Sequence, residues 1–166
     1  MEFVRQPLAP VYNSQSRILI LGSFPSIKSR KQGFYYGNPQ NRFWKVLSAL
    51  LNEPEPVAIE AKRRLLLKHK IALWDVIESC RIEGSDDNSI CDVVPADIGK
   101  LIENSSIRKV YTNGGKAFTL YQRYCEKSTR IPAAKLPSTS PANAAWSLEK
   151  LIADWRGVFA DDLACN

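Results

Sequence analysis

The chain has 166 residues, 45% of them hydrophobic, and a formal net charge of +6 at pH 7. A chain of this length can bury one substantial core, so we expect residues 1–166 to form a single, monomeric domain. No apolar run is long enough to cross a bilayer, and residues 1–5 lack the hydrophobic region of a signal peptide. We therefore expect an intracellular protein, in the cytoplasm or nucleoid, with no membrane partner.

Strand and helix signals alternate along the chain, which is typical of a parallel sheet with helices on both faces. Short apolar runs predict strands, and apolar residues at helical spacing predict helices. The predicted strands are 17–23, 71–77, 108–113 and 133–136, and the predicted helices are 42–51, 57–69, 95–104, 116–127 and 142–159. The second predicted strand leads into a polar segment, residues 81–89, which contains Gly84. The pattern predicts an α/β fold.

Cysteine and histidine residues do not form a metal-binding pattern. Cys80, Cys91, Cys125 and Cys165 are widely separated and include no Cys-x-x-Cys pair, whereas zinc and iron–sulfur sites usually take their ligands from close pairs. The single histidine, His69, lies in a mixed basic and apolar helix pattern, with no ligand or triad partner at useful spacing. We therefore expect no metal, no other cofactor and no histidine-based catalytic triad.

Three loops follow predicted strands and are candidates for one site. They comprise residues 24–41, 113–116 and 137–143. The carboxyl ends of parallel strands lie at the same edge of a sheet, and open α/β sheets bind their ligands at that edge. We therefore expect the three loops to converge.

The first loop carries a run of aromatic side chains. Phe34, Tyr35 and Tyr36 follow one another, and in an extended segment three consecutive rings cannot all face inward. Large aromatic residues usually pack in the core, but one of the three is then left to stack on a nucleic-acid base. We expect Tyr35 or Tyr36 to be this platform, with Phe24 as the opposite wall.

Positive charge is concentrated near the same loop. Residues 1–50 contain seven Lys or Arg and one acidic residue, and the remainder of the chain is balanced. A basic cluster is often only a solvated face, but its coincidence with aromatic and amide side chains favours a site for a polyanion such as DNA. The basic residues expected to contact phosphates are Lys28, Arg30, Lys31 and Arg42.

Two segments resemble the uracil-DNA glycosylase superfamily, specifically its hypoxanthine-DNA glycosylase (deoxyinosine glycosylase) branch. The more specific one is Gly33-Phe-Tyr-Tyr-Gly-Asn-Pro-Gln-Asn-Arg-Phe-Trp44, and the other is Leu136-Pro-Ser-Thr-Ser-Pro-Ala-Asn-Ala144. The likeness covers roughly residues 17–155. It implies a three-layer α/β sandwich around a central, mostly parallel four-stranded sheet, and an enzyme that cuts a damaged base from DNA.

The first motif of the superfamily departs from its common form here. That motif commonly reads Gly-x-Asn-Pro-Gly or Gly-x-Asp-Pro, whereas this chain has Gly22-Ser-Phe-Pro-Ser26, with Phe24 at the polar catalytic position. The resemblance to the deoxyinosine branch implies that the catalytic amide comes from the following loop, from Asn38 or Asn41. Pro39 keeps Asn38 out of the helical region, while Asn41 is also well placed to cap the next helix.

Base recognition is expected from Asn113, with Gly22 beside the base. In the superfamily, an Asn at this strand end reads the Watson–Crick edge of the flipped base, and an amide can match the N1–H and O6 of hypoxanthine. The sequence Thr112-Asn-Gly-Gly115 is also a good turn, so a simple strand-to-helix corner is the alternative.

The last loop resembles the second motif of the superfamily, often His-Pro-Ser-Pro. Leu136 replaces the His, so this position offers the leaving base no cation. Hydroxyl and N–H groups of such a loop suit phosphates. The residues with side-chain hydroxyls or turn geometry that are expected to contact DNA are Ser23, Ser26, Pro137, Ser138, Thr139 and Ser140.

We interpret the chain as a monofunctional DNA glycosylase that flips a deaminated base, foremost hypoxanthine, out of double-stranded DNA. It then hydrolyses the N-glycosidic bond and leaves an abasic site, without a Schiff-base lysine. Three alternatives stay open: a mismatch-directed uracil or xanthine glycosylase, a catalytically silent reader of damaged DNA, and a nucleotide-binding protein with no role on DNA. They differ in base release and in the salt dependence of duplex binding.

Overall fold

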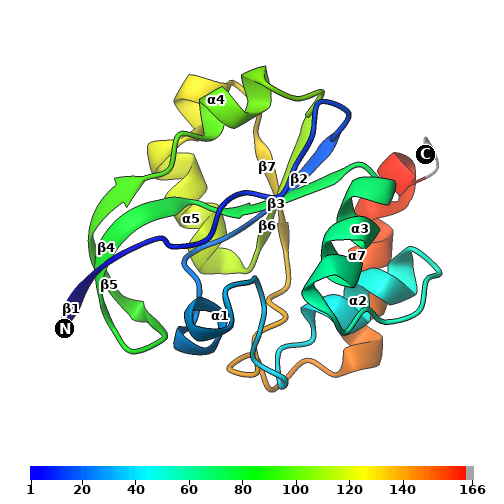
Figure 1. The fold of residues 1–166 in the computed structure, drawn as a ribbon, viewed down its shortest axis with the longest axis horizontal. Coiled ribbons are helices and arrows are strands. Elements are labelled where there is room, and N and C mark those ends of the chain that lie inside the picture. Colours follow the sequence, from blue (N-terminus) through cyan, green and yellow to red (C-terminus); the bar gives the residue numbers. More distant parts are fainter. Residues whose placement is uncertain (164–166) are drawn as a thin grey trace.

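The computed structural model describes residues 1–163. Its centre is a sheet in the order β3-β2-β6-β7, in which every pairing is parallel. These strands are β2 (Ile18–Gly22), β3 (Ile71–Asp75), β6 (Lys109–Asn113) and β7 (Ala133–Leu136). They cross at the centre of the view in Figure 1. The predicted four-stranded parallel sheet is confirmed.

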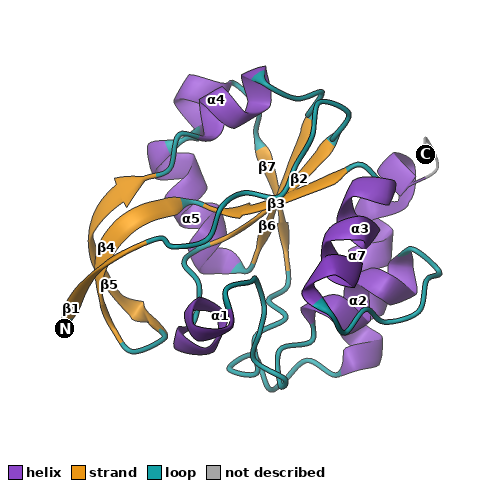
Figure 2. Cartoon of the chain, in the orientation of Figure 1, coloured by secondary structure: helices purple, strands orange, loops and turns teal. Residues whose placement is uncertain are grey.

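Two hydrophobic clusters cover the two faces of this sheet, because successive side chains of a strand point to opposite sides. Ile18 and Ile20 of β2 face a cluster beneath α2 (Phe43–Leu50), α3 (Ile59–Lys68) and α7 (Leu148–Leu163), while Leu19 and Leu21 face the other. That second cluster lies beneath α4 (Ile98–Glu103) and α5 (Gly115–Tyr124). Figure 2 shows the two sets of helices on opposite sides of the sheet.

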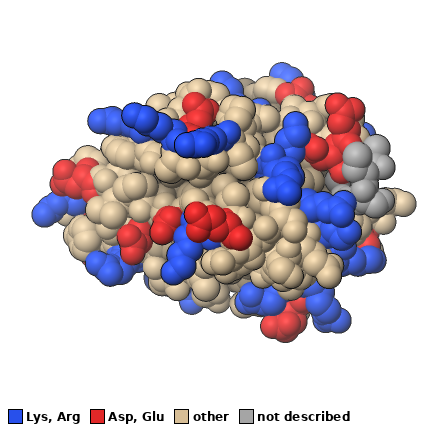
Figure 3. Space-filling view, turned by 90° about the horizontal axis from the view of Figure 1, so that it is seen from above, with Lys and Arg blue, Asp and Glu red and all other residues tan. Residues whose placement is uncertain are grey.

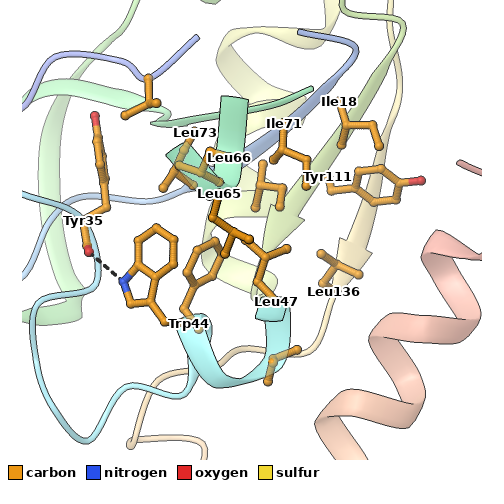
Figure 4. Close-up of a cluster of buried hydrophobic side chains, with 14 of the residues drawn as sticks. Ile18, Tyr35, Trp44, Leu47, Leu65, Leu66, Ile71, Leu73, Tyr111 and Leu136 are labelled. Carbon is orange, nitrogen blue, oxygen red and sulfur yellow. Dashed lines mark hydrogen bonds between the residues drawn. The ribbon is translucent and has the colours of Figure 1, made fainter. Parts of the chain in front are cut away.

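The aromatic loop is anchored in the first of these clusters. Trp44 donates its indole N–H to the backbone oxygen of Tyr35 at 3.2 Å, as drawn in Figure 4. Phe34 stacks on Trp44 with ring centroids 6.1 Å apart. The loop that precedes α2 is therefore anchored by its own aromatic rings.

A second sheet, which the sequence did not predict, flanks the first. It is antiparallel, in the order β1-β4-β5, and consists of β1 (Glu2–Arg5), β4 (Ile77–Glu83) and β5 (Asp86–Pro95). Residues 81–89, the polar segment for which no strand was predicted, belong to a hairpin that turns at Gly84, whose φ is +58°. One face of an antiparallel sheet can be solvated. The polar residues on that face give the segment the composition of a loop.

Helix boundaries also differ from the predicted ones at several points. An unpredicted helix, α1 (Ile27–Gln32), lies inside the first loop, where the Ser26 hydroxyl accepts a hydrogen bond from the backbone N–H of Ser29. The predicted helix 116–127 is divided into α5 and α6 (Glu126–Thr129). The last helix begins at Leu148, six residues later than predicted, because Ser147 caps it by accepting from the N–H of Lys150.

The described part of the chain supplies no constellation for a metal ion. Cys80 and Cys125 are buried and Cys91 is exposed, all three as free thiols, whereas Cys165 lies outside the described residues. His69 lies 3.1 Å from a carboxylate oxygen of Glu53. Among residues 1–163, no three His, Cys, Asp or Glu side chains are grouped so that they could hold an ion. None of the helices in this range combines the length and apolarity of a membrane crossing.

Candidate active site

A cleft of about 870 Å³ lies at the carboxyl ends of the central strands. The last residue of each strand lines it: Gly22 of β2, Asp75 of β3, Asn113 of β6 and Leu136 of β7. The loops after β2, β6 and β7 complete the wall, so the three predicted loops do meet. Two of these loops form the lower edge of the molecule in Figure 1. The face seen from above in Figure 3, around α4, carries charges of both signs.

Asp75 and Tyr36 meet over Gly22 in this cleft. Asp75 is 4% exposed, and its Oδ2 accepts a hydrogen bond from Nε2 of Gln6 at 2.7 Å. A Cβ atom at Gly22 would collide with Oδ1 of Asp75 and would lie 3.1 Å from Oη of Tyr36. Only glycine leaves room for these two polar groups at the end of β2.

The carboxyl of Asp75 is held close to neutrality. Burial raises its pKa to about 7, the hydrogen bond from Gln6 lowers the pKa, and the nearby Asp87 raises it again. Asp87 belongs to β5 and accepts a hydrogen bond from Oγ of Ser23 at 2.7 Å. Burial raises the pKa of Asp87 too, while Ser23 and Lys116 oppose that shift. The cleft thus contains two carboxyl groups with raised pKa values.

Tyr36 combines a packed ring with a free hydroxyl. Its ring stacks on Phe43, with centroids 4.0 Å apart, and its backbone is in the left-handed region at φ 53°. Its Oη is buried and finds no hydrogen-bond partner of standard geometry within residues 1–163. Burial first, then the Asp75 carboxyl, raises the pKa of Tyr36, and the Asn113 side chain opposes them. The hydroxyl is therefore a donor that lacks an acceptor.

Thr139 ties the loops together. Its hydroxyl donates to Oδ1 of Asn41 at 2.8 Å and accepts from Nδ2 of Asn113 at 2.9 Å. Its backbone N–H donates to Oδ1 of Asn113 at 3.1 Å, and its carbonyl accepts from the N–H of Arg42. Thr139 is fully buried. One residue therefore joins the loop before α2, the end of β6 and the loop after β7.

Arg42 reinforces the same junction from the other side. Its guanidinium donates to the carbonyl oxygens of Ser140 at 3.0 Å, Asn143 at 3.1 Å and Trp146. These carbonyls all belong to the loop between β7 and α7. A charged donor that satisfies three backbone carbonyls fastens this loop to the start of α2.

The sequence model of the uracil DNA glycosylase superfamily matches residues 9–161. The chain belongs to this superfamily. The match spans all four strands of the central sheet and every loop that lines the cleft. The superfamily fold expected from the sequence is confirmed.

Relatives within the superfamily match over nearly the full length. A protein of Methanosarcina acetivorans named hypoxanthine DNA glycosylase is 34% identical over 160 residues, covering 94% of this chain and 98% of its own. A protein of Methanosarcina barkeri with the same name is 36% identical over 89 residues, or 53% and 56% of the two chains. A solution NMR structure from Methanosarcina acetivorans, described as a candidate uracil DNA glycosylase, superposes with a TM-score of 0.81 at 33% identity. The superposition covers 95% of this chain and 97% of the other.

Tyr35, one of the two predicted base platforms, borders the cleft but is packed into the core. Its ring is 2% exposed and packs edge-on against Phe34, and its hydroxyl donates to the backbone oxygen of Ala9 at 2.9 Å. The alternation argument for the aromatic run was wrong, because residues 33–36 form turns rather than an extended strand. Phe24 lines the cleft but is only 8% exposed.

The three predicted amides all line the cleft, yet they differ in free capacity. Oδ1 of Asn38 accepts from the N–H of Gln40 at 3.0 Å, in a turn of its own. Oδ1 of Asn41 accepts both the Thr139 hydroxyl and the N–H of Phe43, which occupies both of its lone pairs. The side-chain amide of Asn113 makes two hydrogen bonds, both with Thr139: its Nδ2 donates to the hydroxyl, and its Oδ1 accepts from the backbone N–H.

The predicted DNA-contacting residues are divided between surface and scaffold. Lys28 and Lys31 are exposed on α1, whereas Arg30 donates to the backbone oxygen of Gly84 at 3.3 Å. Arg42 and Thr139 are used inside the protein, as described above. The hydroxyls that satisfy neighbouring protein groups are those of Ser23, Ser26, Ser138 and Ser140, and Pro137 lines the cleft beside them.

Sequence reasoning missed the two carboxyl groups, Asp75 and Asp87. Asp75 lies inside the predicted strand 71–77 as its one charged residue and proves to be the last residue of β3. A charged residue in a buried parallel strand, close to its carboxyl end, is a usable signal. Asp87 lies in the polar segment 81–89, for which no strand was predicted, so nothing in the pattern placed it near the cleft. Gln6, the partner of Asp75, is 69 positions away in the sequence.

Proposed function

We propose that this superfamily member is a monofunctional DNA glycosylase that releases a deaminated base, foremost hypoxanthine, from double-stranded DNA. The observation that carries the proposal is the cleft in which the ends of all four central strands meet. Its volume of about 870 Å³ accommodates a purine nucleotide. Two relatives named hypoxanthine DNA glycosylase support hypoxanthine as the substrate.

DNA binding is assigned to the rim of the cleft. Lys28 and Lys31 are exposed on α1, next to the first loop, and contribute charge to phosphates without reading sequence. On the other side, the loop of residues 137–143 offers the backbone N–H of Ser138 and the hydroxyls of Ser138 and Ser140, while its other N–H groups are bonded within the protein. The protein acts as a monomer on a flipped nucleotide, and deaminated bases flip at lower cost because they pair poorly.

The catalytic amide is Asn38. The alternative, Asn41, has its Oδ1 saturated by Thr139 and Phe43, whereas Oδ1 of Asn38 accepts a single backbone N–H and keeps one lone pair. That lone pair can orient a water molecule toward C1′ of the sugar. Pro39 and the hydrogen bond from the N–H of Asn41 to the carbonyl of Asn38 fix the turn that presents this amide.

Asn113 contributes to base recognition with its remaining capacity. Thr139 leaves it one N–H and one oxygen lone pair, enough to pair with the O6 and N1–H of hypoxanthine. Adenine presents the reverse pattern, an amino group and an unprotonated N1, so the buried amide would disfavour it. Phe24 and the ring of Tyr36 confine the base.

The test is base release from duplex oligonucleotides that contain a single deoxyinosine, deoxyuridine or deoxyxanthosine, detected as alkali-sensitive abasic sites. We expect release from deoxyinosine, and intact strands before alkali because no lyase step is involved. Preferential release from deoxyuridine or deoxyxanthosine would replace the substrate assignment. Duplex binding without release from any base would favour a silent reader, the function suggested by Phe24 at the usual catalytic position.

A matched pair of variants tests the assignment of the amide. Asn38→Ala is expected to lower the single-turnover rate about 100-fold or more while duplex affinity is retained. Asn41→Ala removes a scaffold contact instead, so it should lower the melting temperature together with the rate. A wild-type rate for Asn38→Ala would contradict the assignment.

A further inference from the structure

Two polar groups of the cleft have unused hydrogen-bonding capacity next to each other. Oδ1 of Asp75 makes no hydrogen bond within residues 1–163, since the one bond to this carboxyl goes to Oδ2. Oη of Tyr36 is buried and has no hydrogen-bond partner of standard geometry in the same range, although the nearby Asn113 side chain lowers its pKa. Both atoms crowd the position that a Cβ of Gly22 would occupy. Buried polar groups in native proteins nearly always have partners, so the Tyr36 hydroxyl, with the unbonded oxygen of Asp75 near it, points to a ligand atom in the complex.

The surroundings of Asp75 favour the protonated form of its carboxyl, because burial raises the pKa to about 7. The groups that face it are Gln6 from the segment after β1, Tyr35 and Tyr36 from the loop before α2, and Asp87 from β5. None of them is a cation, and no ion pair within residues 1–163 involves Asp75. Lys116 acts on Asp87 instead. A protonated carboxyl has one O–H to donate, and Oδ1 is the oxygen that is free.

Two neighbouring O–H donors match the Hoogsteen edge of a 6-oxopurine, which presents N7 and O6 as adjacent acceptors. Adenine presents an acceptor and an amino donor there, and uracil has no N7. Asp75 lines the same cleft as Asn38 and Asn113 and is more deeply buried than either. The amides can therefore serve the sugar and the N1 side, leaving the carboxyl for N7.

We propose that Asp75 is a catalytic acid that donates its Oδ1 proton to N7 of the departing hypoxanthine, while Tyr36 donates a hydrogen bond to O6. This inference rests on the proposed glycosylase function. In the step, the C1′–N9 bond breaks and its electron pair stays on the base, which takes the Asp75 proton and leaves as neutral hypoxanthine. Water adds to C1′, and the proton that it loses restores the Asp75 carboxyl. The net reaction consumes one water molecule.

The raised pKa of Asp75, about 7, is consistent with this role, because an efficient general acid has a pKa close to the working pH. Above that pKa the proton is lost. We therefore expect the wild-type rate of hypoxanthine release to fall about tenfold per pH unit on the alkaline side.

The experiment compares wild type with Asp75→Asn on deoxyinosine duplexes, in single turnover, from about two pH units below to about two above the pKa. Asn keeps an acceptor for Gln6 and a donor toward N7 but transfers no proton. We expect a rate loss of about 100-fold or more, a profile without the Asp75 inflection, and unchanged duplex affinity. Tyr36→Phe should lower the rate about tenfold and leave the inflection in place.

Two controls separate proton transfer from a general loss of structure. On a 7-deazadeoxyinosine duplex, which lacks N7, wild type and Asp75→Asn should be equally slow. Asp87→Asn keeps an acceptor for Ser23 but removes the charge that raises the Asp75 pKa, so it should move the wild-type inflection to lower pH.

A wild-type rate and pH profile for Asp75→Asn would overturn the inference and leave the glycosylase function intact. An equal loss of rate by this variant on deoxyinosine and on its 7-deaza analogue would also overturn it. If wild type releases no hypoxanthine at any pH, the proposed function itself fails.

Discussion

At the scale of single residues, Gly22 is a glycine that is required for the space it leaves to neighbouring side chains and not for its backbone conformation. The residue ends β2 without a positive φ, so backbone conformation does not require glycine there. The requirement comes from Oδ1 of Asp75 and Oη of Tyr36, which occupy the space that a side chain would take. A polar floor of the cleft is possible only because this side chain is missing.

Gly22→Ala is therefore expected to lower the rate of base release at least tenfold, because the new Cβ collides with Asp75 Oδ1. Gly157→Ala is the matched control, since a Cβ at that position in α7 meets nothing within 4 Å and should leave the rate unchanged. Oligonucleotide cleavage assays on both variants provide the measurement. Equal rates for Gly22→Ala and wild type would show that Asp75 and Tyr36 tolerate displacement.

Asp75 also makes stability depend on pH. Its folded pKa, about 7, is raised above its ordinary value of 3.8, so between these values the folded state binds the extra proton and the free energy of unfolding falls as pH rises. The full penalty, present above pH 7, has an upper bound of about 4 kcal/mol. Asp75→Asn removes this penalty.

We expect Asp75→Asn to be more stable than wild type above pH 7, with a gain that shrinks toward pH 4. Urea denaturation over this pH range measures the difference between the two proteins. Asp92→Asn is the control, because its exposed pair with Arg81 contributes little at any pH. A gain of the same size at every pH would contradict the linkage.

At the scale of elements, the site depends on how three loops are fastened rather than on any one strand. Thr139 bonds Asn41 and Asn113 with one hydroxyl, and Arg42 holds three carbonyls of the loop before α7. The residues that sequence reasoning assigned to DNA thus include several that shape the cleft.

Thr139→Val keeps the shape of this buried side chain and removes its hydroxyl, which leaves Asn41 and Asn113 each without one partner. We expect the free energy of unfolding to fall by about 1–3 kcal/mol, together with the rate of base release. Chemical denaturation and cleavage assays measure the two effects. Thr119→Val is the control, since the Thr119 hydroxyl bonds the Gly115 carbonyl on the exposed face of α5 and should change neither.

Elements that are deeply buried could be predicted from the pattern of residues, whereas elements that are largely exposed to solvent could not. The run Ile18-Leu-Ile-Leu21 is buried on both faces of the sheet and identified β2. In β5, by contrast, the residues are exposed or half-buried, so its apolar residues carried no readable period. The helix start at Leu148 was missed because Trp146 has helical spacing to the apolar residues of α7 but lies in the preceding loop.

The location of the site could be predicted from the sequence, but the hydrogen bonds between its residues could not. Parallel strands deliver their ends to one edge, so the cleft and its three loops follow from the order of elements. Which amide is free depends on hydrogen bonds between residues as distant as Asn41 and Thr139, 98 positions apart. Such pairings leave no local signal in one sequence.

At the scale of the whole molecule, the positive charge of residues 1–50 is less available to DNA than its total implies. Arg42 is consumed by backbone carbonyls, Lys45 pairs with Glu55 at 3.3 Å, and Arg30 bonds the hairpin turn. Lys28 and Lys31 are exposed on α1 and form no ion pair within residues 1–163. Phosphate contacts should therefore depend on these two.

The salt dependence of binding tests this distribution of charge. Each phosphate neutralised contributes about −0.9 to the slope of log affinity against log salt concentration, so Lys28→Gln combined with Lys31→Gln should make that slope shallower by about 1.8. Fluorescence anisotropy of a labelled duplex over a series of NaCl concentrations gives the slope. Lys45→Gln removes a charge that Glu55 already neutralises and should leave it unchanged. An equal change for both variants would mean that DNA responds to net charge alone, whereas a change confined to the double variant places the phosphate backbone across α1, beside the cleft.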